Sequence, residues 1–270
     1  MSSVPTMSTA VPIERAPLSL RRTLRAYLME VRFDTLGALR TPAFAIPFIA
    51  LPLLIYVLFG VVINRNAGSV SEFGPAIANY LFTGFAVLAV AMPGIFSGVI
   101  LAQEREGNLL RLKRAQPLPP GATIVAKLLM AMAIAAVAVT LVVIAALAGG
   151  LLTISLTQVA VIWAVLIVGS VPFCAIGLMI GAISSASAAP AWGNLLFLPM
   201  MWLSGLFIPL PAFLEAWVVI WPSFHLSQLA LGLAGVEQFR FIPTTFAAGV
   251  LLGVTVLCGG LAIRRLARHG

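Results

Sequence analysis

Residues 128–147 read LLMAMAIAAVAVTLVVIAAL, a run without a charged side chain that decides the fold class. A helix needs about 20 mostly apolar residues to cross the hydrocarbon core of a bilayer, and this run supplies them. No Asp, Glu, Lys or Arg follows until Glu215, so the apolar character continues far beyond the run. The stretch therefore predicts a membrane-spanning helix with further spans after it.

The composition of the whole chain supports the same interpretation. Of 270 residues, 61% are hydrophobic and 9% are charged, whereas a soluble domain has about 25% charged residues. This excludes a soluble enzyme and a disordered chain. The sequence predicts an all-α polytopic membrane protein. The cysteines Cys174 and Cys258 lie in apolar runs, so we expect buried hydrophobes and neither a disulfide nor a metal pair.

Apolar runs of suitable length predict six transmembrane helices, at residues 44–63, 80–102, 124–147, 159–183, 192–208 and 245–263. Pro172 is expected to kink the fourth of these spans. Residues 209–243 are too apolar for a loop, yet their runs 212–220 and 224–234 are too short to cross. We expect two short re-entrant helices there, broken at Pro222.

The chain before the first span divides into a tail and a helix. Residues 1–17 are rich in Ser, Thr and Pro and predict a disordered tail. Residues 18–40 predict an amphipathic helix lying at the membrane interface. Its apolar stripe comprises Leu20, Leu24, Tyr27, Leu28 and Val31, and its basic side comprises Arg21, Arg22, Arg25 and Arg32. A solvated helix packed on another protein is the alternative. Residues 41–270 then form the transmembrane domain.

The distribution of Lys and Arg predicts the orientation. With six spans, fourteen of these residues share the side of both termini, and two, Arg65 and Arg240, lie on the other. Basic residues favour the cytoplasmic side, so both termini are expected in the cytoplasm. The net charge of +8 thus reflects membrane orientation, and no nucleic-acid binding is expected.

Few groups in the chain can do chemistry. The cores of the predicted spans lack ionisable side chains, which disfavours a proton-coupled transporter, and Lys127 at a span end is expected to snorkel to water. There is no metal-ligand cluster, no catalytic nucleophile with a base, and no G-x-x-x-x-G-K-[ST] loop for ATP. We therefore expect no enzyme activity or bound cofactor in this chain, and ATP with Mg on a separate subunit.

One cytoplasmic loop, residues 103–121, has a distinctive sequence, QEREGNLLRLKRAQPLPPG. It resembles the segment E-R-E-x-G-T-L-E-x-L, followed by a proline turn and a Lys, in permease subunits of type-2 ATP-binding-cassette (ABC) exporters. The matching residues are Glu104, Arg105, Glu106, Leu110, Leu112, Pro117 and Lys127. Two positions depart from the pattern: Asn108 replaces the usual Gly, and Arg111 stands where an acid is common. Asn tolerates a left-handed backbone, so the first departure is expected to be harmless.

Two later stretches extend this resemblance over residues 18–268. Residues 203–211, LSGLFIPLP, are similar to the family's S-G-x-F-x-P ending of the fifth span. Residues 221–226, WPSFHL, are similar to its step from proline to histidine or tyrosine before the last span.

The resemblance implies a permease that pairs with a second copy, identical or different, on two ATPase subunits in the bacterial cytoplasmic membrane. It would export a hydrophobic or amphipathic substrate. The implied ATPase-coupling residues, in one helix over 104–115, are Glu104, Arg105, Glu106, Leu109, Leu110 and Leu112. The implied exit-side residues are Ser204, Gly205, Pro209, Glu215, Pro222 and His225.

Several alternatives remain open at this stage. Glu104 and Glu106 either contact an ATPase or cap a helix, and His225 is either a hydrogen-bonded structural residue or a proton carrier. G-x-x-x-G pairs indicate packing within one bundle or a dimer seam; they are Gly94/Gly98, Gly177/Gly181 and Gly249/Gly253. A lipid-linked glycan exporter permease, or a passive channel or structural membrane subunit, would share the hydropathy.

Overall fold

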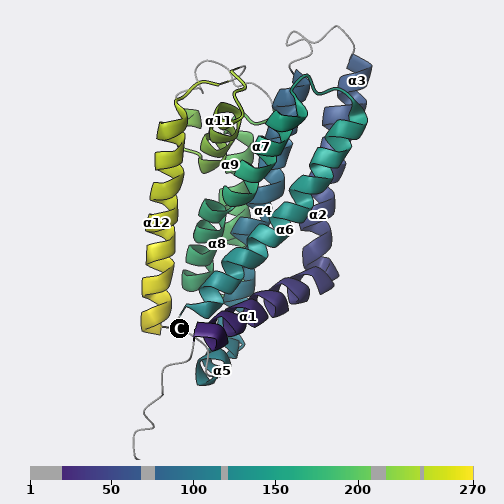
Figure 1. Ribbon diagram of the computed structural model, residues 1–270. Coiled ribbons are helices and arrows are strands. Elements are labelled where there is room, and N and C mark those ends of the chain that lie inside the picture. The colour runs from purple at the N-terminus through teal and green to yellow at the C-terminus, as the bar shows by residue number, and fades with distance from the viewer. Residues whose placement is uncertain (1–19, 68–76, 117–120, 208–216, 238–239, 270) are drawn as a thin grey trace, which may run out of the picture.

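The computed structural model describes residues 20–67, 77–116, 121–207, 217–237 and 240–269, and all regular structure within them is helical. The helices form an elongated bundle (Figure 1). They are α1 (Leu20–Arg40), α2 (Pro42–Tyr56) with its π-helical continuation η1 (Val57–Ile63), α3 (Asn64–Ala67), α4 (Ile77–Glu106), α5 (Leu109–Ala115), α6 (Ala122–Gly149), α7 (Leu156–Val168), α8 (Val171–Ile183), α9 (Ala189–Trp202), α11 (Pro222–Leu233) and α12 (Thr244–His269).

Five helices of the described chain are long and apolar enough to cross a membrane. They are Pro42–Ile63, Ile77–Glu106, Ala122–Gly149, Leu156–Ile183 and Thr244–Arg268. They coincide with five of the six predicted spans. The remaining predicted span, 192–208, falls on α9, which has 14 residues. At 1.5 Å per residue that is about 21 Å, less than the roughly 30 Å of a bilayer core.

The two ends of the bundle are defined by their contacts. At one end lie α1, α5 and the C-terminal end of α12 (Figure 1). At the other end, Arg65 donates to the Gly149 carbonyl at 2.6 Å, and the Thr153 amide donates to Asn79 Oδ1 at 3.0 Å. Helix α8 ends near α5 and α12 begins at the far end. The chain between them therefore returns along the bundle.

Helix α4 is the centre of the bundle. Within its most apolar window 83% of residues are buried, against 22% for α2 and for α12. A Cβ atom at Gly98 would overlap the Gly177 carbonyl, and one at Gly94 would lie 2.7 Å from Phe173 Cβ. The first two G-x-x-x-G pairs thus pack α4 against α8 inside one chain. Gly249, in contrast, has nothing within 4 Å of its Cβ position.

The fourth span, which Pro172 was expected to kink, is interrupted just before that residue. Helix α7 ends at Val168 and α8 begins at Val171, so Pro172 occupies the first turn of α8, where its missing N–H costs no hydrogen bond. Both cysteines are buried free thiols, as expected. The residues of the predicted tail lie outside the described residues.

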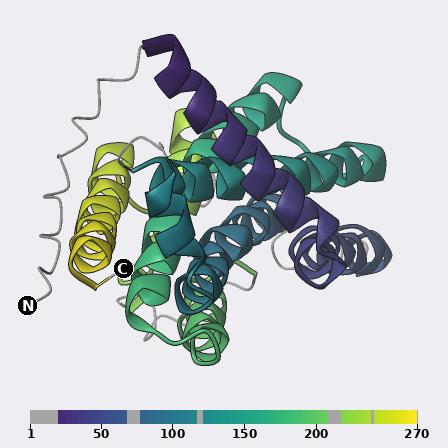
Figure 2. The ribbon, with the colours of Figure 1, turned by 90° about the horizontal axis from the view of Figure 1, so that it is seen from below.

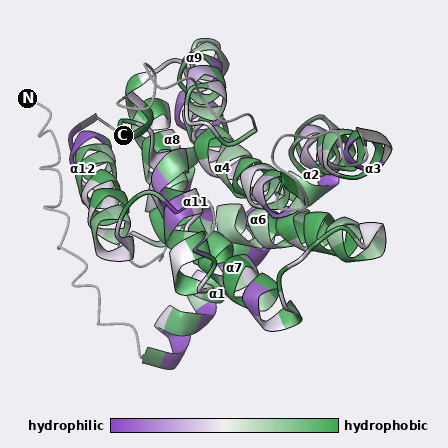
Figure 3. Ribbon diagram, turned by 90° about the horizontal axis from the view of Figure 1, so that it is seen from above, coloured by the Kyte–Doolittle hydropathy of each residue, from purple (hydrophilic) through white to green (hydrophobic). Residues whose placement is uncertain are grey.

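Helix α1 runs across the end of the bundle, at a steep angle to the other helices (Figure 2). Seen from the opposite end, the outer helices carry mostly hydrophobic residues, and α1 carries several hydrophilic ones (Figure 3). Exposed apolar residues on α2, η1 and α12 include Leu54, Leu58, Leu252 and Val256. Such faces suit lipid or another helix.

The segment before α12 contains a short helix where one was predicted. Helix α11 begins at Pro222, which fixes the first-turn φ without losing a hydrogen bond. Most of the predicted partner helix over 212–220 lies outside the described residues.

Candidate functional site

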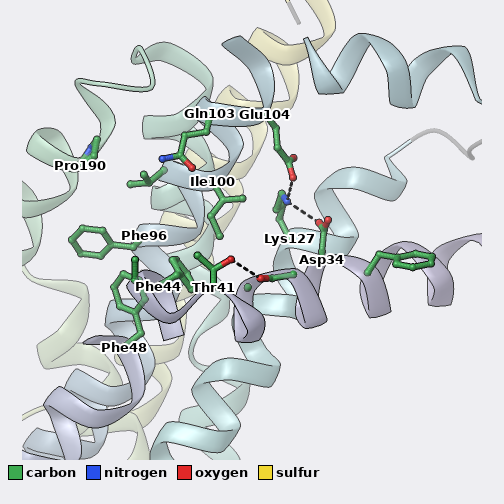
Figure 4. A pocket seen from close by; sticks show the side chains of 15 residues that line it. Asp34, Thr41, Phe44, Phe48, Phe96, Ile100, Gln103, Glu104, Lys127 and Pro190 are labelled. Atoms are coloured by element: carbon green, nitrogen blue, oxygen red, sulfur yellow. Dashed lines mark hydrogen bonds and ion pairs between the residues drawn. The ribbon is translucent and has the colours of Figure 1, made fainter. Parts of the chain in front are cut away.

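Five charged side chains meet where α1, α4, α5 and α6 converge, and we call them the charge cluster. Its members are Glu30 and Asp34 on α1, Glu104 on α4, Lys113 on α5 and Lys127 on α6. Figure 4 shows the carboxylates of Glu104 and Asp34 converging on Lys127 from two helices. The cluster therefore connects the interface helix to the charged loop and to two long helices.

Lys127 is the innermost member. Its Nζ lies 2.6 Å from Glu104 Oε1 and 2.8 Å from Asp34 Oδ2, and 1% of its side chain is exposed. The prediction that this lysine snorkels to water is wrong. The reason is that two carboxylates reach it inside the protein, which compensates the desolvation of its charge.

Lys113 joins α5 to the same group. Its Nζ lies 2.6 Å from Glu30 Oε1, 3.4 Å from Asp34 Oδ1 and 3.7 Å from Glu104 Oε1. Burial by itself lowers the pKa of Lys113, but the hydrogen bond to Glu30 and the nearby carboxylates outweigh it and raise the pKa above its usual value. Lys113 is therefore a cation at every physiological pH.

The charge cluster contains more negative than positive groups. Three carboxylates face two ammonium groups, and the buried oxygen Glu104 Oε2 has neither a hydrogen bond nor an ion pair with the described residues. A buried charge without full compensation is costly. The excess acid therefore calls for a functional explanation.

The six predicted ATPase-coupling residues separate into two groups. Glu104 lies in the charge cluster, Leu110 is buried, and Arg105 donates to the carbonyls of Ala182 and Ser184 at the end of α8, the latter at 2.6 Å. These three hold the loop to the bundle. The other three are exposed at the end of the bundle: Glu106, Leu109 and Leu112.

The predicted continuous helix over 104–115 is instead two helices. Helix α4 continues to Glu106, and α5 starts at Leu109 after a left-handed residue, Asn108, with φ of 60°. Asn adopts this conformation more readily than other non-glycine residues, so it replaces the family's Gly here. Gln116, before Pro117, is extended, as a residue preceding proline prefers.

The described residues among those predicted for the exit side lie near α9 and α11. Ser204 is buried and donates to the Met201 carbonyl at 3.2 Å, and Gly205 has a φ of 66°. His225 is buried, with Nε2 2.8 Å from the Val219 carbonyl, which favours a structural role over proton transfer. Pro209 and Glu215 lie outside the described residues.

Glu30 and Asp34 were missed by the sequence analysis. They stand four residues apart, on one face of a helix whose other charges are basic. That isolated acid pair was the available signal, together with Lys127 as a lone cation at the start of an apolar span.

A second feature is an apolar cavity of about 230 Å³ between α2, α4 and α9. Its lining residues are all hydrophobic and include Ile55, Phe59, Phe85, Met92, Phe197 and Trp202. We call it the apolar cavity. Its walls suit hydrocarbon or aromatic groups and offer no catalytic chemistry.

Comparison with known proteins assigns the chain to a family. No curated protein matches the sequence. The family model described as "ABC-2 type transporter" matches residues 27–241, which include the charge cluster, the charged loop and the apolar cavity. Because the match covers well over half of the chain, the protein belongs to the ABC-2 type transporter family and is a membrane permease.

Proposed function

We propose that the protein is the membrane subunit of an ATP-driven exporter. It pairs with a second permease copy, and two separate ATPase subunits bind the end of the bundle where α1 and α5 lie. The pair moves a hydrophobic or amphipathic substrate out through the bacterial cytoplasmic membrane. ATP and Mg belong to the ATPase subunits, since this chain has no phosphate-binding loop.

The observation that carries this proposal is the corner between α4 and α5. Glu106, Leu109 and Leu112 are exposed there, while Arg105 and Lys113 bond the same segment to the bundle. An exposed apolar and acidic surface on a firmly held base can receive force from a partner and pass it to the helices. The charged side chain of Glu106 would be unfavourable on a surface that faces lipid.

The basic residues support the orientation. Arg264, Arg265 and Arg268 are exposed at the end of α12, at the same end of the bundle as α1 and its arginines. Under the positive-inside rule this end faces the cytoplasm, where ATPase subunits are located.

The apolar surfaces support the substrate class and the pairing. The apolar cavity lies beside α2 and η1, whose outer face exposes Leu51, Leu54 and Phe59. A second copy placed against this face would enclose a hydrophobic path between the two chains. Because the cavity lacks charged walls, it favours apolar parts of a substrate over ions or sugars.

The test is reconstitution in inside-out vesicles. The permease with its ATPase should accumulate a fluorescent amphiphile when ATP is supplied, and a variant ATPase unable to hydrolyse ATP serves as the control. The permease alone should accumulate nothing with ATP or with a pH gradient. Uptake driven by a pH gradient without any ATPase would contradict the proposal.

A further inference from the structure

A larger cavity, of about 520 Å³, lies next to the charge cluster and apart from the α4–α5 corner. It is enclosed by α1, the base of α2 and the end of α4, with Pro190 of α9 at its edge (Figure 4). We call it the acidic cavity. Its volume is within the range of about 300–1,000 Å³ that is usual for small-molecule sites.

The walls of the acidic cavity carry an excess of negative charge. Among the described residues that line it, three are charged: Asp34, Glu104 and Lys127. Lys127 bonds both carboxylates, and Lys113 lies 3.4 Å from Asp34 and 3.7 Å from Glu104. Lys113 pairs most closely with Glu30, at 2.6 Å, so the charge cluster as a whole keeps one negative charge in excess. Two arginines on the same helix as Asp34, Arg32 and Arg40, are exposed, where water and salt weaken their effect. The wall therefore attracts a cation.

One carboxylate oxygen of a residue that lines the acidic cavity lacks a partner. Glu104 Oε2 is buried and receives no hydrogen bond from the described residues, although Oε1 of the same carboxylate bonds Lys127 at 2.6 Å. A buried acceptor without a donor costs roughly 1–3 kcal/mol. A ligand with an ammonium group would remove that cost.

The opposite wall is aromatic and leads to the apolar cavity. Ring centroids of Phe44 and Phe48 lie 4.3 Å apart, those of Phe48 and Phe96 5.2 Å, and those of Phe96 and Phe197 5.9 Å. Phe96 lines the acidic cavity and Phe197 lines the apolar cavity. Aromatic faces attract organic cations, and the row of rings in contact runs from the acidic cavity to the apolar cavity.

We propose that the acidic cavity binds the ammonium group of an amphipathic cation, whose apolar part lies along Phe48 and Phe96 toward the apolar cavity. The inference rests on the proposed function only in naming this ligand as exported substrate. Binding itself needs neither ATP nor a partner. The wall residues Asp34 and Glu104 then select charge, and the rings select hydrophobic character.

The test measures binding to the full chain in phosphatidylcholine nanodiscs. The probe is radiolabelled dodecylammonium, whose N–H groups can donate to a carboxylate, compared with dodecyl sulfate and dodecanol, which have the same chain. The cation should bind at least about tenfold more tightly than either comparison ligand. Equal affinities for the three ligands would overturn the proposal.

Gln103 gives a variant that leaves every ion pair of the cluster in place. It lines the acidic cavity and is exposed. Gln103→Lys should weaken binding of the cation about tenfold through charge repulsion, and Gln103→Glu should strengthen it. Gln116→Lys is the matched control, since Gln116 is exposed outside the cavity, and should leave affinity unchanged. The same effect from Gln103→Lys and Gln116→Lys would show that only the overall charge matters and would overturn the proposal.

Two further arms identify the source of the ligand. Adding phosphatidylethanolamine to the nanodiscs should displace the probe if a lipid amine occupies the cavity, and should not if the ligand comes from solution. Both results keep the ammonium site. ATP-driven uptake is measured separately with the ATPase present, so intact binding without transport would refute the exporter function and leave this site standing.

Discussion

Lys113 on α5 and Glu30 on α1 form an ion pair of 2.6 Å whose side chains are 13% and 12% exposed. The helix next to the proposed ATPase surface is thereby bonded to the helix that runs across the end of the bundle. The same α1 carries Asp34, which reaches Lys127 on α6. A movement of α5 has a direct route to α1 and α6 through these contacts.

The first prediction tests that route. Lys113→Glu places an acid beside three carboxylates, and breaking a mostly buried pair costs about 2–5 kcal/mol. We expect ATP hydrolysis to continue with little transport. Adding Glu30→Lys restores an opposite pair and should recover part of the coupling, measured as substrate moved per ATP hydrolysed.

The control is an exposed pair at the other end of the bundle. Arg240 Nη1 and Glu237 Oε1 lie 2.7 Å apart, and Glu237 is mostly exposed. Arg240→Ala should change stability by about 0–1 kcal/mol and leave coupling unchanged. If Lys113→Glu behaves like this control, the α5–α1 ion pair has no part in coupling.

The second prediction separates the two acids of the loop. Glu104→Lys places a cation against Lys127 in a buried site, so the folded fraction in detergent should fall, as measured by size-exclusion chromatography. Glu106→Lys changes an exposed residue and should leave folding intact while weakening co-purification of the ATPase. If the folded Glu106→Lys variant binds the ATPase normally, Glu106 only stabilises the helix and does not contact the ATPase.

The third prediction concerns the packing of α4 on α8. Gly98→Ala puts a methyl group into the Gly177 backbone, and overpacking of this kind costs roughly 1–3 kcal/mol. The midpoint of thermal unfolding should therefore fall. Gly253→Ala, where nothing lies within 4 Å, is the matched control and should be neutral or slightly stabilising. Equal midpoints for the two variants would show that α4 and α8 do not approach closely enough at Gly98 for a methyl group to clash.

The fourth prediction concerns orientation. In a background without Cys174 and Cys258, Glu237→Cys should react with a membrane-impermeant thiol reagent in intact cells, and Gln116→Cys should react only after the cells are lysed. Both positions are exposed. Gln116 directly follows α5 and Glu237 precedes the start of α12, and these helix ends lie at opposite ends of the bundle. Labelling of Gln116→Cys alone in intact cells would reverse the orientation.

Much of the fold is determined by the sequence alone, because apolar length and helix breakers act locally. Uncharged runs such as 128–147 form a spanning helix regardless of which other segments pack against them. Pro172 ends a helical stretch, and Asn108 accepts a left-handed turn, through steric effects within a few residues. These features were predictable, as was the charged loop after the second long helix.

The charge cluster was decided only by tertiary structure. In the sequence, Lys127 is separated from Asp34 by 93 positions, and nothing local indicates that α1 folds back over α6 to bring them within 2.8 Å. The free energy of each buried charge then depends on which partners reach it. Those contacts stabilise an ion pair excluded from water, and sequence spacing does not encode them.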